Sequence, residues 1–575
     1  MCGFVGGTNP ELNYAAALTS IAHRGPDAEQ LVSSPPFHVG FRRLAIIDLR
    51  DVANQPMIFD DGESWIVFNG EIYGYKTLRS ELEREGQRFR TDSDTEVLLR
   101  AYLVWGNDFV EHLDGMFAIA IWDARVRKLE LYRDRPGIKP LYYFFDGRHF
   151  AFASELKALT AICPGLEIDE TALFDFLTYR YIPAPKTPYR SIAKLPPAHR
   201  LTFEPDRMTL SESRRYWQIE VPNDVAPRDI GECAEELRAV IDAAVKNQMV
   251  ADVPVGFFLS GGVDSSAVVA SATNFSNRLK TFSIGFDSAE HSEVSYAREV
   301  ADRFGTDHHE RTLTKAHAEQ MLPSVAGWFD EPFADESCLP TQFVSATARE
   351  KVTVVLTGDG GDEVFGGYRT YSRFARYSRF PSWPEGVNNW ISRWRDRARG
   401  RRAKKALSQI EWAFSDDIAL WGKLMNALTP EEKRPYAEEF GIPADYDHYW
   451  HYREHWRDDL PLRTRLQLVD FNTYLPGDIL TKVDRTSMSV SLEARVPLLD
   501  RRVIEFSFGL PESTRFADGE LKGLLKRAYR GTLPDSVLDR KKKGFGTPRY
   551  YFSSAGPTEL QRRLLAEFRI RYPDL

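Results

Sequence analysis

A chain of 575 residues is longer than one hydrophobic core usually organises, so its length predicts two domains. Its 43% apolar and 27% charged residues are typical of a globular protein, and a net charge of −8 argues against nucleic acid as the main partner. The four cysteines have no paired spacing, so they predict no disulfide framework and no zinc site. Without a signal-like N-terminus or an apolar stretch long enough to cross a bilayer, we expect a cytoplasmic protein with no membrane contact.

Cys2 directly follows the initiator methionine. Removal of that methionine would leave a free α-amine and a thiol on one residue. An α-amine has an ordinary pKa of about 7.7–8.0, so it can act as the base for its own thiol. The alternative is that a cysteine stands here by accident, and Cys2 taken alone does not decide between the two.

Closely spaced, strand-like runs occupy the first part of the chain, and they suit antiparallel sheets. These features predict a first domain over residues 1–210. Residues 211–232 carry prolines and acids without apolar periodicity, which indicates a linker. The pattern of apolar residues changes in 233–575, where apolar strands alternate with helical patterns. This alternation predicts a parallel α/β sheet with added helices. Within it, the basic stretch 393–405 is read as a solvated helix face rather than an anion-binding surface.

Two glycine-rich loops follow buried strands of the second domain. "LSGGVDSS" (259–266) runs from a strand into a helix, whose N-terminus offers N–H groups to phosphate oxygens. The loop lacks the ending of a Walker loop and resembles the pyrophosphate-binding loop of ATP pyrophosphatases. "TGDGGDEVFGGY" (357–368) adds the acids Asp359, Asp362 and Glu363. Either loop alone could be a turn that caps a helix; together they indicate a nucleotide and magnesium site.

With these features in view, the chain resembles the glutamine-hydrolysing asparagine synthetases. The resemblance covers nearly the full length and is carried by motifs in one order. These are "MCGFVGG" (1–7), "HRGPD" (23–27), "RRLAIID" (42–48), "FNGEIYGY" (68–75), "TDSDTEV" (91–97), "LDGMFAIAIWD" (113–123), "RDRPGIKPLYY" (133–143), "ASELKAL" (153–159), the two loops above and "YLPGDILTKVDRTSMSVSLEARVPLLD" (474–500).

For the first domain, the resemblance implies an αββα sandwich of the N-terminal-nucleophile type that hydrolyses glutamine. Cys2 would be the nucleophile, with its own α-amine as the base. Asn69 and the Gly70 N–H would form the oxyanion site, and Arg43 would bind the glutamine carboxylate. Asp94, with Glu71, would bind the α-ammonium group. The alternatives are a surface ion pair for Arg43 and a plain turn at Asn69–Gly70.

For the second domain, the resemblance implies ATP-dependent acyl adenylation followed by attack of ammonia, which would reach the site through an internal tunnel. Asp264 and Asp362 would bind Mg²⁺, and Lys522 would stabilise charge on the α-phosphate. Lys522 could instead be a solvated helix residue. The residues that would bind ATP are Phe258, Ser260, Gly261, Gly262, Asp264, Ser265, Ser266, Ile284, Gly358 and Asp359.

Two positions depart from the family pattern. Many asparagine synthetases have Glu where this chain has Asp359, whose carboxylate is implicated in catalysis and is here one methylene shorter. Glu336 stands where a small polar residue is expected, and a further negative charge beside an acceptor carboxylate would be costly. Either Glu336 points away from the site or the acceptor carries a cation there.

Three hypotheses follow. The first is synthesis of L-asparagine from L-aspartate, with ATP and Mg²⁺. The second is the same chemistry on another carboxylate, such as a uronic acid of a surface polysaccharide or a secondary-metabolite intermediate. The third is a catalytically silent relative, which the retained Cys2, Asn69, Asp264, Asp362 and Lys522 disfavour. The partners in the first two are small molecules, and the oligomeric state stays open, with a homodimer among the alternatives.

Overall fold

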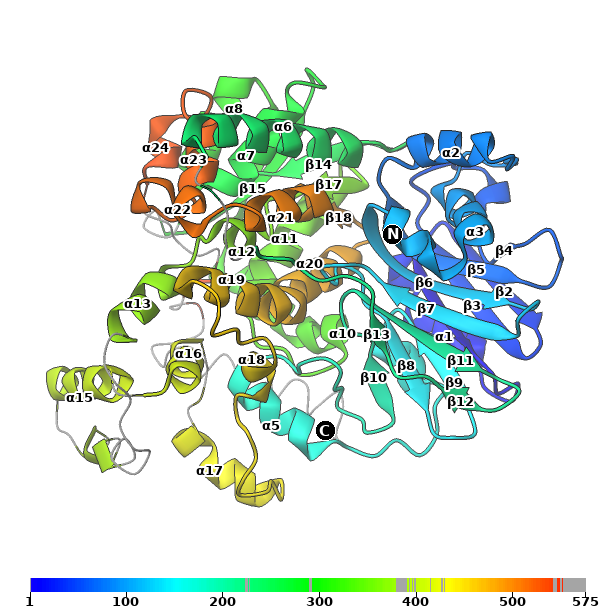
Figure 1. The fold of residues 1–575 in the computed structure, drawn as a ribbon, viewed down its shortest axis with the longest axis horizontal. Helices are drawn as coiled ribbons and strands as arrows, with labels where there is room; N and C mark the ends of the chain where they lie inside the picture. Colours follow the sequence, from blue (N-terminus) through cyan, green and yellow to red (C-terminus); the bar gives the residue numbers. More distant parts are fainter. Residues whose placement is uncertain are drawn as a thin grey trace.

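The computed structural model describes residues 2–222, 226, 228–288, 292–378, 390–391, 393–395, 397, 400–413, 415–425, 428, 430–540, 546–548 and 551. Two antiparallel sheets lie at one end of the molecule, and a parallel sheet with most of the helices lies at the other (Figure 1). Among the described residues, no helix has both the length and the apolar character that a membrane span needs.

The first antiparallel sheet has the order β10-β8-β9-β1-β3-β2, and the second has the order β12-β11-β7-β6-β5-β4, with β13 paired to β11. The strands of the first are β1 (Gly3–Gly7), β2 (Ala28–Ser34), β3 (Phe37–Arg43), β8 (Tyr142–Phe145), β9 (Phe150–Ala153) and β10 (Ile192–Lys194). Those of the second are β4 (Met57–Ile58), β5 (Trp65–Ile72), β6 (Gly115–Asp123), β7 (Lys128–Arg133), β11 (His199–Glu204), β12 (Thr209–Leu210) and β13 (Arg214–Arg215).

The two sheets pack face to face around an aromatic core. Phe37 of the first sheet meets Trp65 and Trp122 of the second, with ring centroids 5.9 and 5.0 Å apart. Because successive side chains of a strand point to opposite faces, Phe4 enters this core while Val5 packs outward against helix α1 (Tyr14–Ser20). The helices α2 (Tyr75–Arg84) and α3 (Asp94–Trp105) cover the outer face of the second sheet. The predicted four-layer αββα sandwich is confirmed.

The parallel sheet has the order β16-β15-β14-β17-β18. Its strands are β14 (Val255–Phe258), β15 (Lys280–Phe286), β16 (Asp307–Leu313), β17 (Val354–Leu356) and β18 (Glu493–Arg495). Apolar residues of α6 (Ile230–Gln248), α7 (Val263–Ala272) and α8 (Val294–Phe304) cover one face of the sheet. Helices α11 (Cys338–Arg349) and α20 (Leu480–Met488) cover the other. This α/β sheet is also as predicted.

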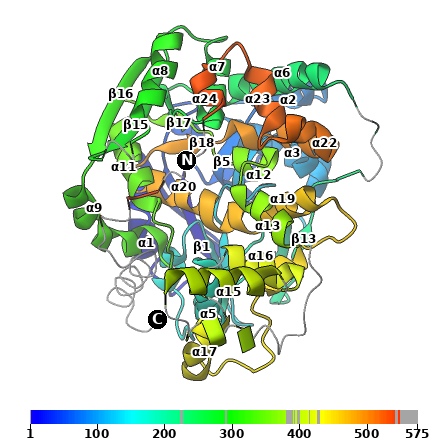
Figure 2. The same ribbon diagram turned by 90° about the vertical axis from the view of Figure 1, so that its left-hand side faces the viewer.

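Further helices surround the sheet, and most of them form the layer that faces the viewer in Figure 2. They are α9 (Lys315–Met321), α10 (Val325–Phe329), α12 (Gly361–Phe365), α13 (Arg369–Tyr377), α15 (Arg401–Ala413), α16 (Asp417–Met425), α17 (Pro430–Glu439), α18 (Trp450–Glu454), α19 (Leu462–Asn472), α21 (Arg501–Phe508), α22 (Glu512–Arg515), α23 (Gly523–Tyr529) and α24 (Asp535–Leu538). The basic stretch 393–405 lies partly outside the described residues.

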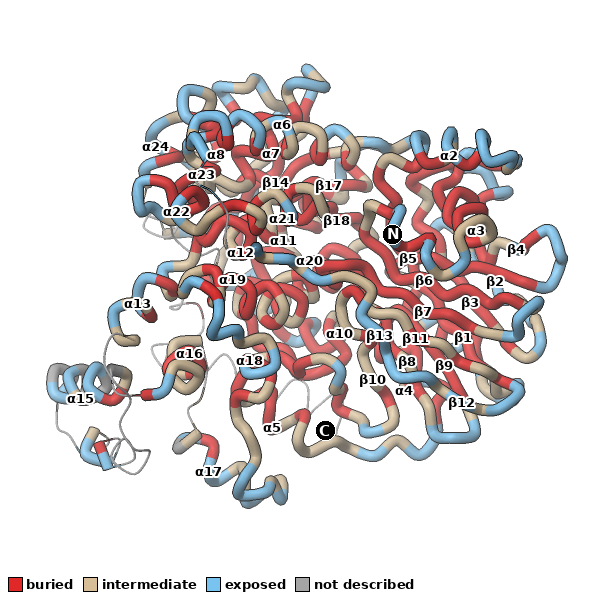
Figure 3. Tube along the Cα trace, viewed as in Figure 1, coloured by how far each residue is buried: buried red, intermediate tan, exposed pale blue. Residues whose placement is uncertain are grey.

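Two helices lie between strands β9 and β10 in the chain, α4 (Leu156–Thr160) and α5 (Glu170–Tyr179). Helix α5 leaves the sandwich, because Phe176 and Tyr179 are buried in one cluster with Trp421 and Tyr452 of the helical layer. Buried residues fill both sheet regions and helix α20 (Figure 3). The two halves of the chain therefore share an extensive buried interface.

Candidate active sites

Cys2 lies directly before β1 and is only 9% exposed. Its backbone nitrogen donates to Oδ1 of Asn69 at 3.0 Å, and its Sγ lies 3.9 Å from the carbonyl oxygen of Leu44. Burial raises the pKa of the Cys2 thiol. A thiol in this environment needs an adjacent base before it can act as a nucleophile. The nitrogen that hydrogen-bonds to Asn69 is the one that methionine removal would turn into an α-amine.

Asn69 and Gly70 lie on β5, beside the cysteine. Asn69 is fully buried, and within the described part of the chain its Nδ2 has no hydrogen-bond partner. An unsatisfied buried donor is costly unless a ligand uses it. Gly70 pairs with Phe117 of β6, and a Cβ at position 70 would lie only 2.8 Å from the Phe117 Cα. The close strand contact requires glycine here.

Arg43 ends β3 and is held by the loop that follows it. Its Nη1 donates to the Arg50 carbonyl oxygen at 2.9 Å and to Oδ1 of Asn54 at 2.8 Å, and its Nη2 donates to the carbonyl oxygens of Ile47 and Asp48 at 3.3 and 2.5 Å. These bonds fix the guanidinium near the Cys2 thiol, whose pKa it lowers. To bind the carboxylate of a substrate through two hydrogen bonds, Arg43 must therefore lose at least one of these four hydrogen bonds.

Glu71 and Asp94 form a buried acidic pair on the same side of the site. Oδ2 of Asp94, at the start of α3, accepts the Ile72 N–H at 3.0 Å. Burial raises the pKa of Asp94 to about 6 and the pKa of Glu71 well above its ordinary value. The carboxylate of Glu493, a third buried acid, also raises the pKa of both residues, and Asp94 further raises the pKa of Glu71. Such a cluster is suited to a ligand that brings a positive charge.

The second half of the chain completes this acidic cluster. Nη2 of Arg495 lies 3.5 Å from Oε1 of Glu71, and its Nε lies 2.6 Å from Oε1 of Glu493. Both residues belong to β18 of the parallel sheet. Glu493 and Arg495 lie in a motif of the family resemblance (474–500), but no role could be predicted for them, because no local spacing shows that residues more than 400 positions apart meet.

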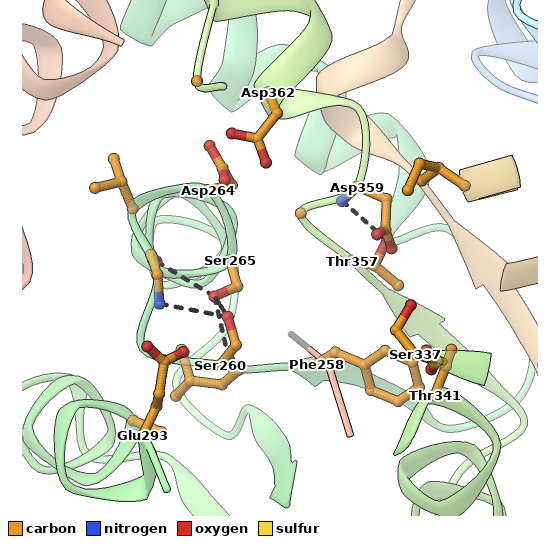
Figure 4. Close-up of a pocket in the computed structure, with 18 of the residues that line it drawn as sticks. Phe258, Ser260, Asp264, Ser265, Glu293, Ser337, Thr341, Thr357, Asp359 and Asp362 are labelled. Atoms are coloured by element: carbon orange, nitrogen blue, oxygen red, sulfur yellow. Dashed lines mark hydrogen bonds between the residues drawn. The ribbon is translucent and has the colours of Figure 1, made fainter. Parts of the chain in front are cut away.

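The glycine loop after β14 folds tightly against α7. Oγ of Ser260 lies 3.0 Å from Oγ of Ser265, and the Gly262 N–H donates to Ser260 Oγ at 3.3 Å (Figure 4). Gly261 has φ 68°, and a Cβ there would lie 2.6 Å from the backbone nitrogen of Ala297. The N-terminus of α7 is therefore open to a phosphate group at the carboxyl end of the sheet.

The second glycine loop lies directly beside the first. A Cβ at Gly358 would lie 2.5 Å from the backbone nitrogen of Ser265, so the two loops touch. Thr357 donates its hydroxyl to Oδ2 of Asp359 at 2.7 Å. Burial raises the pKa of Asp359, although Lys482 and Thr357 oppose this effect. Asp359 is thus a carboxylate that accepts a proton more readily than an exposed aspartate does.

Lys522 bridges the two carboxylates that were predicted to bind metal. Its Nζ contacts Oδ2 of Asp264 and lies 2.6 Å from Oδ1 of Asp362. Burial lowers the pKa of Lys522, but the two carboxylates raise it by more, so the lysine stays charged. Figure 4 shows the carboxylates of Asp264 and Asp362 pointing toward one another. A Cβ at Gly361 would lie 2.6 Å from Asp264 Oδ1, so glycine lets the second loop come close to this carboxylate, whose oxygens are ligands that Mg²⁺ prefers.

These loops open into a cavity of about 1300 Å³. Phe258 and Ile284, two of the residues predicted to bind ATP, line it near the carboxyl ends of β14 and β15. Gly261 and Ser266 are the two predicted ATP-binding residues that do not line the cavity. Glu336 also lines it, so the alternative in which this residue points away is not supported.

Lys482 lies on α20 and reaches the same cavity. Its Nζ lies 2.9 Å from Oδ2 of Asp335 and 2.7 Å from Oγ of Ser337. Two residues further along the same helix, Asp484 binds Arg24 of the first half. One helix therefore contacts both sites.

Comparison with known proteins agrees with this geometry. A model of the asparagine synthase family matches residues 236–571, and a model of the glutamine amidotransferase domain matches residues 1–217. Asparagine synthetase [glutamine-hydrolyzing] 1 of Bacillus subtilis is 34% identical, with 99% of this chain and 90% of the relative covered. The chain belongs to the glutamine-hydrolysing asparagine synthetase family.

Other relatives of this family are more distant. Asparagine synthetase [glutamine-hydrolyzing] 3 of Bacillus subtilis is 31% identical over 92% of this chain and 82% of the relative. A protein of Gibberella zeae named amidase chry2 is 28% identical over 93% of this chain and 85% of the relative. Membership makes the chain a glutamine-dependent enzyme that uses ATP to amidate a small-molecule acid.

Proposed function

We propose that this enzyme converts L-aspartate, ATP and glutamine to L-asparagine, AMP, diphosphate and glutamate. The observation that carries the proposal is the pairing of a buried Cys2–Asn69 site with a cavity built from two strand-end glycine loops, both in contact with α20. Glutamine hydrolysis at the first site supplies ammonia, and the second site supplies an activated acid. A buried interface between them supports the passage of ammonia inside the protein.

At the first site, the α-amine of Cys2 takes the thiol proton, and the thiolate attacks the amide carbon of glutamine. Asn69 Nδ2 and the Gly70 N–H donate to the oxyanion that develops. The C–N bond breaks, ammonia leaves with the proton from the amine, and water then hydrolyses the thioester to glutamate. Asp94 and Glu71 bind the α-ammonium of glutamine, while Arg43 binds its carboxylate.

At the second site, a carboxylate oxygen of the acceptor attacks the α-phosphorus of ATP, the bond to the β-phosphate breaks and diphosphate leaves. Ammonia then attacks the acyl carbon, the acyl–phosphate C–O bond breaks and AMP leaves. Asp359 takes the proton that the nitrogen loses, which suits its raised pKa. Lys522 moves from the two aspartates to the α-phosphate charge. Asp264 and Asp362 would hold Mg²⁺, which when bound neutralises phosphate charge.

Glu336 supports aspartate as the acceptor. A carboxylate on the cavity wall disfavours an acceptor that is only anionic, whereas an α-ammonium group offsets its charge. A uronic acid carries no such cation. The second candidate, amidation of another carboxylate, is favoured by the amidase-named relative and by the shorter side chain of Asp359.

The test is diphosphate release with ATP, Mg²⁺ and glutamine, with and without L-aspartate, together with mass detection of asparagine. Aspartate-dependent diphosphate with asparagine supports the proposal. If glutamine is hydrolysed but aspartate does not stimulate diphosphate release, the two-site mechanism still holds and aspartate is not the acceptor. Uronic acids are then the next acceptors to test.

A further inference from the structure

The cavity of the second half of the chain is also lined by a residue of the first half. Arg180 directly follows α5, the helix that leaves the sandwich and packs into the helical layer, and it lines the cavity together with Asp335, Glu336 and Lys482. Residues of both halves thus build one ligand site.

The backbone around Arg180 is firmly held. Its φ of 71° lies in the left-handed region, which a residue other than glycine adopts only when its surroundings impose it. Its carbonyl oxygen accepts the Ala334 N–H at 2.9 Å. The neighbouring Tyr179 and Tyr181 are 4% and 2% exposed, so both anchor the segment in the core. The side chain of Arg180 therefore lines the cavity from a backbone segment that is held in one conformation.

The guanidinium of Arg180 has no protein partner in the described part of the chain. Its Nε is buried without a hydrogen-bond partner, and no ion pair joins the side chain to a described carboxylate. Lys482, by contrast, is bonded to Asp335 and Ser337. A buried donor without a partner costs free energy that a bound ligand can recover.

Arg180 is surrounded by acidic residues that lie outside the two glycine loops. Burial lowers the pKa of Arg180, but the nearby groups Tyr474, Asp478, Asp335 and Glu336 raise it by more. Asp335 and Asp478 also raise the pKa of Lys482, and so does Asp359 of the second glycine loop, so Lys482 is near both groups of acids. An acceptor whose reacting carboxylate lies near Asp359 would therefore extend its other groups toward Arg180 and Glu336.

We propose that Arg180 binds a second anionic group of the acceptor, one that is not amidated, and so selects amino dicarboxylic acids over amino acids with a single carboxylate. The planar guanidinium matches a carboxylate in a two-bond arrangement, and the neighbouring Glu336 matches an amine on the same substrate. This inference rests on the proposed amidation of an acid at this site.

A purely structural role for Arg180 is the alternative, because a cation also offsets the acids around it. The two roles differ in what they do to substrates. A structural residue affects every acceptor equally, whereas a binding residue affects only acceptors that carry the group it binds.

The experiment uses the full-length enzyme with an ammonium salt as nitrogen donor, so that the glutaminase site is not involved. Diphosphate release is measured with L-aspartate and with β-alanine, which is aspartate without the α-carboxylate, and also with L-glutamate and glucuronate. The variants are Arg180→Gln, Arg180→Lys and, as a matched control, Arg369→Gln, because Arg369 lines the same cavity but is exposed.

We expect Arg180→Gln to lower kcat/KM for aspartate about 100-fold and to leave the low rate with β-alanine and the KM for ATP within threefold. Arg180→Lys recovers part of the loss, and Arg369→Gln leaves the aspartate to β-alanine ratio unchanged. An equal loss of kcat/KM for aspartate and β-alanine in Arg180→Gln would overturn the proposed role of Arg180. So would a wild-type enzyme that uses β-alanine or glucuronate as well as it uses aspartate. Neither result would contradict the amidation of an acid at this site. Absence of acid-dependent diphosphate with all four acids overturns the proposed function, and this inference with it.

Discussion

Arg24 and Asp484 are 460 positions apart in the chain, and their side chains form a two-bond ion pair inside the protein. Nη1 and Nη2 of Arg24 donate to the two carboxylate oxygens at 2.8 and 3.1 Å. The same guanidinium donates from Nε to the carbonyl oxygen of Cys2 at 3.1 Å. One arginine therefore holds both the cysteine of the first site and helix α20, whose Lys482 lines the second.

Replacing Arg24 by Met should weaken this connection. The variant removes one cation from the buried Asp484 and Glu155, which keep Lys139 and Arg485 as other partners. Loss of one partner of a buried pair costs up to about 3–5 kcal/mol. We expect a lower thermal midpoint and a ratio of glutamate formed to diphosphate released that rises above one, because ammonia escapes. Both are measured on the same preparation.

The control for Arg24 is Arg298→Met, which removes an arginine from an exposed pair with Glu310. Exposed pairs contribute about 0–1 kcal/mol, so the thermal midpoint and the ratio should stay close to wild type. An Arg24→Met enzyme with an unchanged product ratio would show that the pair has a structural role alone.

Cys2→Ala should abolish glutamine-dependent diphosphate release and spare the ammonia-dependent reaction. The thiol is the only group proposed to attack glutamine, and the cavity residues around Lys522 are not altered by the change. Both reactions are measured at saturating ATP and acceptor. Loss of the ammonia-dependent reaction in a folded variant would contradict the division of labour between the two sites.

Much of this arrangement could be predicted from sequence. Asn69, Glu71 and Asp94 lie near one another in the chain, and the two glycine loops end neighbouring strands, so local patterns and family resemblance were sufficient to find them. Glu493, Arg495 and Arg180 were missed because their partners are hundreds of residues away and only tertiary packing brings them together. The four acceptors that hold Arg43 were also not foreseen, since a loop conformation fixes them.

Lys522→Met should reduce diphosphate release by a factor of about 100 to 1000 and leave glutamine hydrolysis unchanged, because the lysine is proposed to stabilise charge that develops on the α-phosphate. The matched control is Lys526→Met, in helix α23, which begins directly after Lys522. Lys526 lines the same cavity but is paired with the exposed Glu520 at 2.7 Å. Its activity should stay within a few-fold of wild type. Equal losses in the two variants would mean that Lys522 contributes only general positive potential.

Glutamine binding should weaken as the pH falls through about 6. Burial raises the pKa of Asp94 to about 6, so above that pH the carboxylate is charged and binds the α-ammonium of glutamine, and below it protonation removes the attraction. An aspartate with its ordinary pKa of 3.8 would give constant affinity above pH 5. Dissociation constants of the Cys2→Ala variant, measured by calorimetry between pH 5 and 8, report this without turnover.

Two further variants decide whether Asp94 is the group responsible. Asp94→Asn should bind glutamine weakly at every pH and lose the dependence, since its side chain carries no titrating proton. Asp92→Asn makes the same chemical change two positions earlier, at a side chain that is 74% exposed, and should keep the wild-type profile. A pH dependence that persists in Asp94→Asn would assign the titration to Glu71 instead. Burial raises the pKa of Glu71 as well, and the neighbouring Glu493 raises it further.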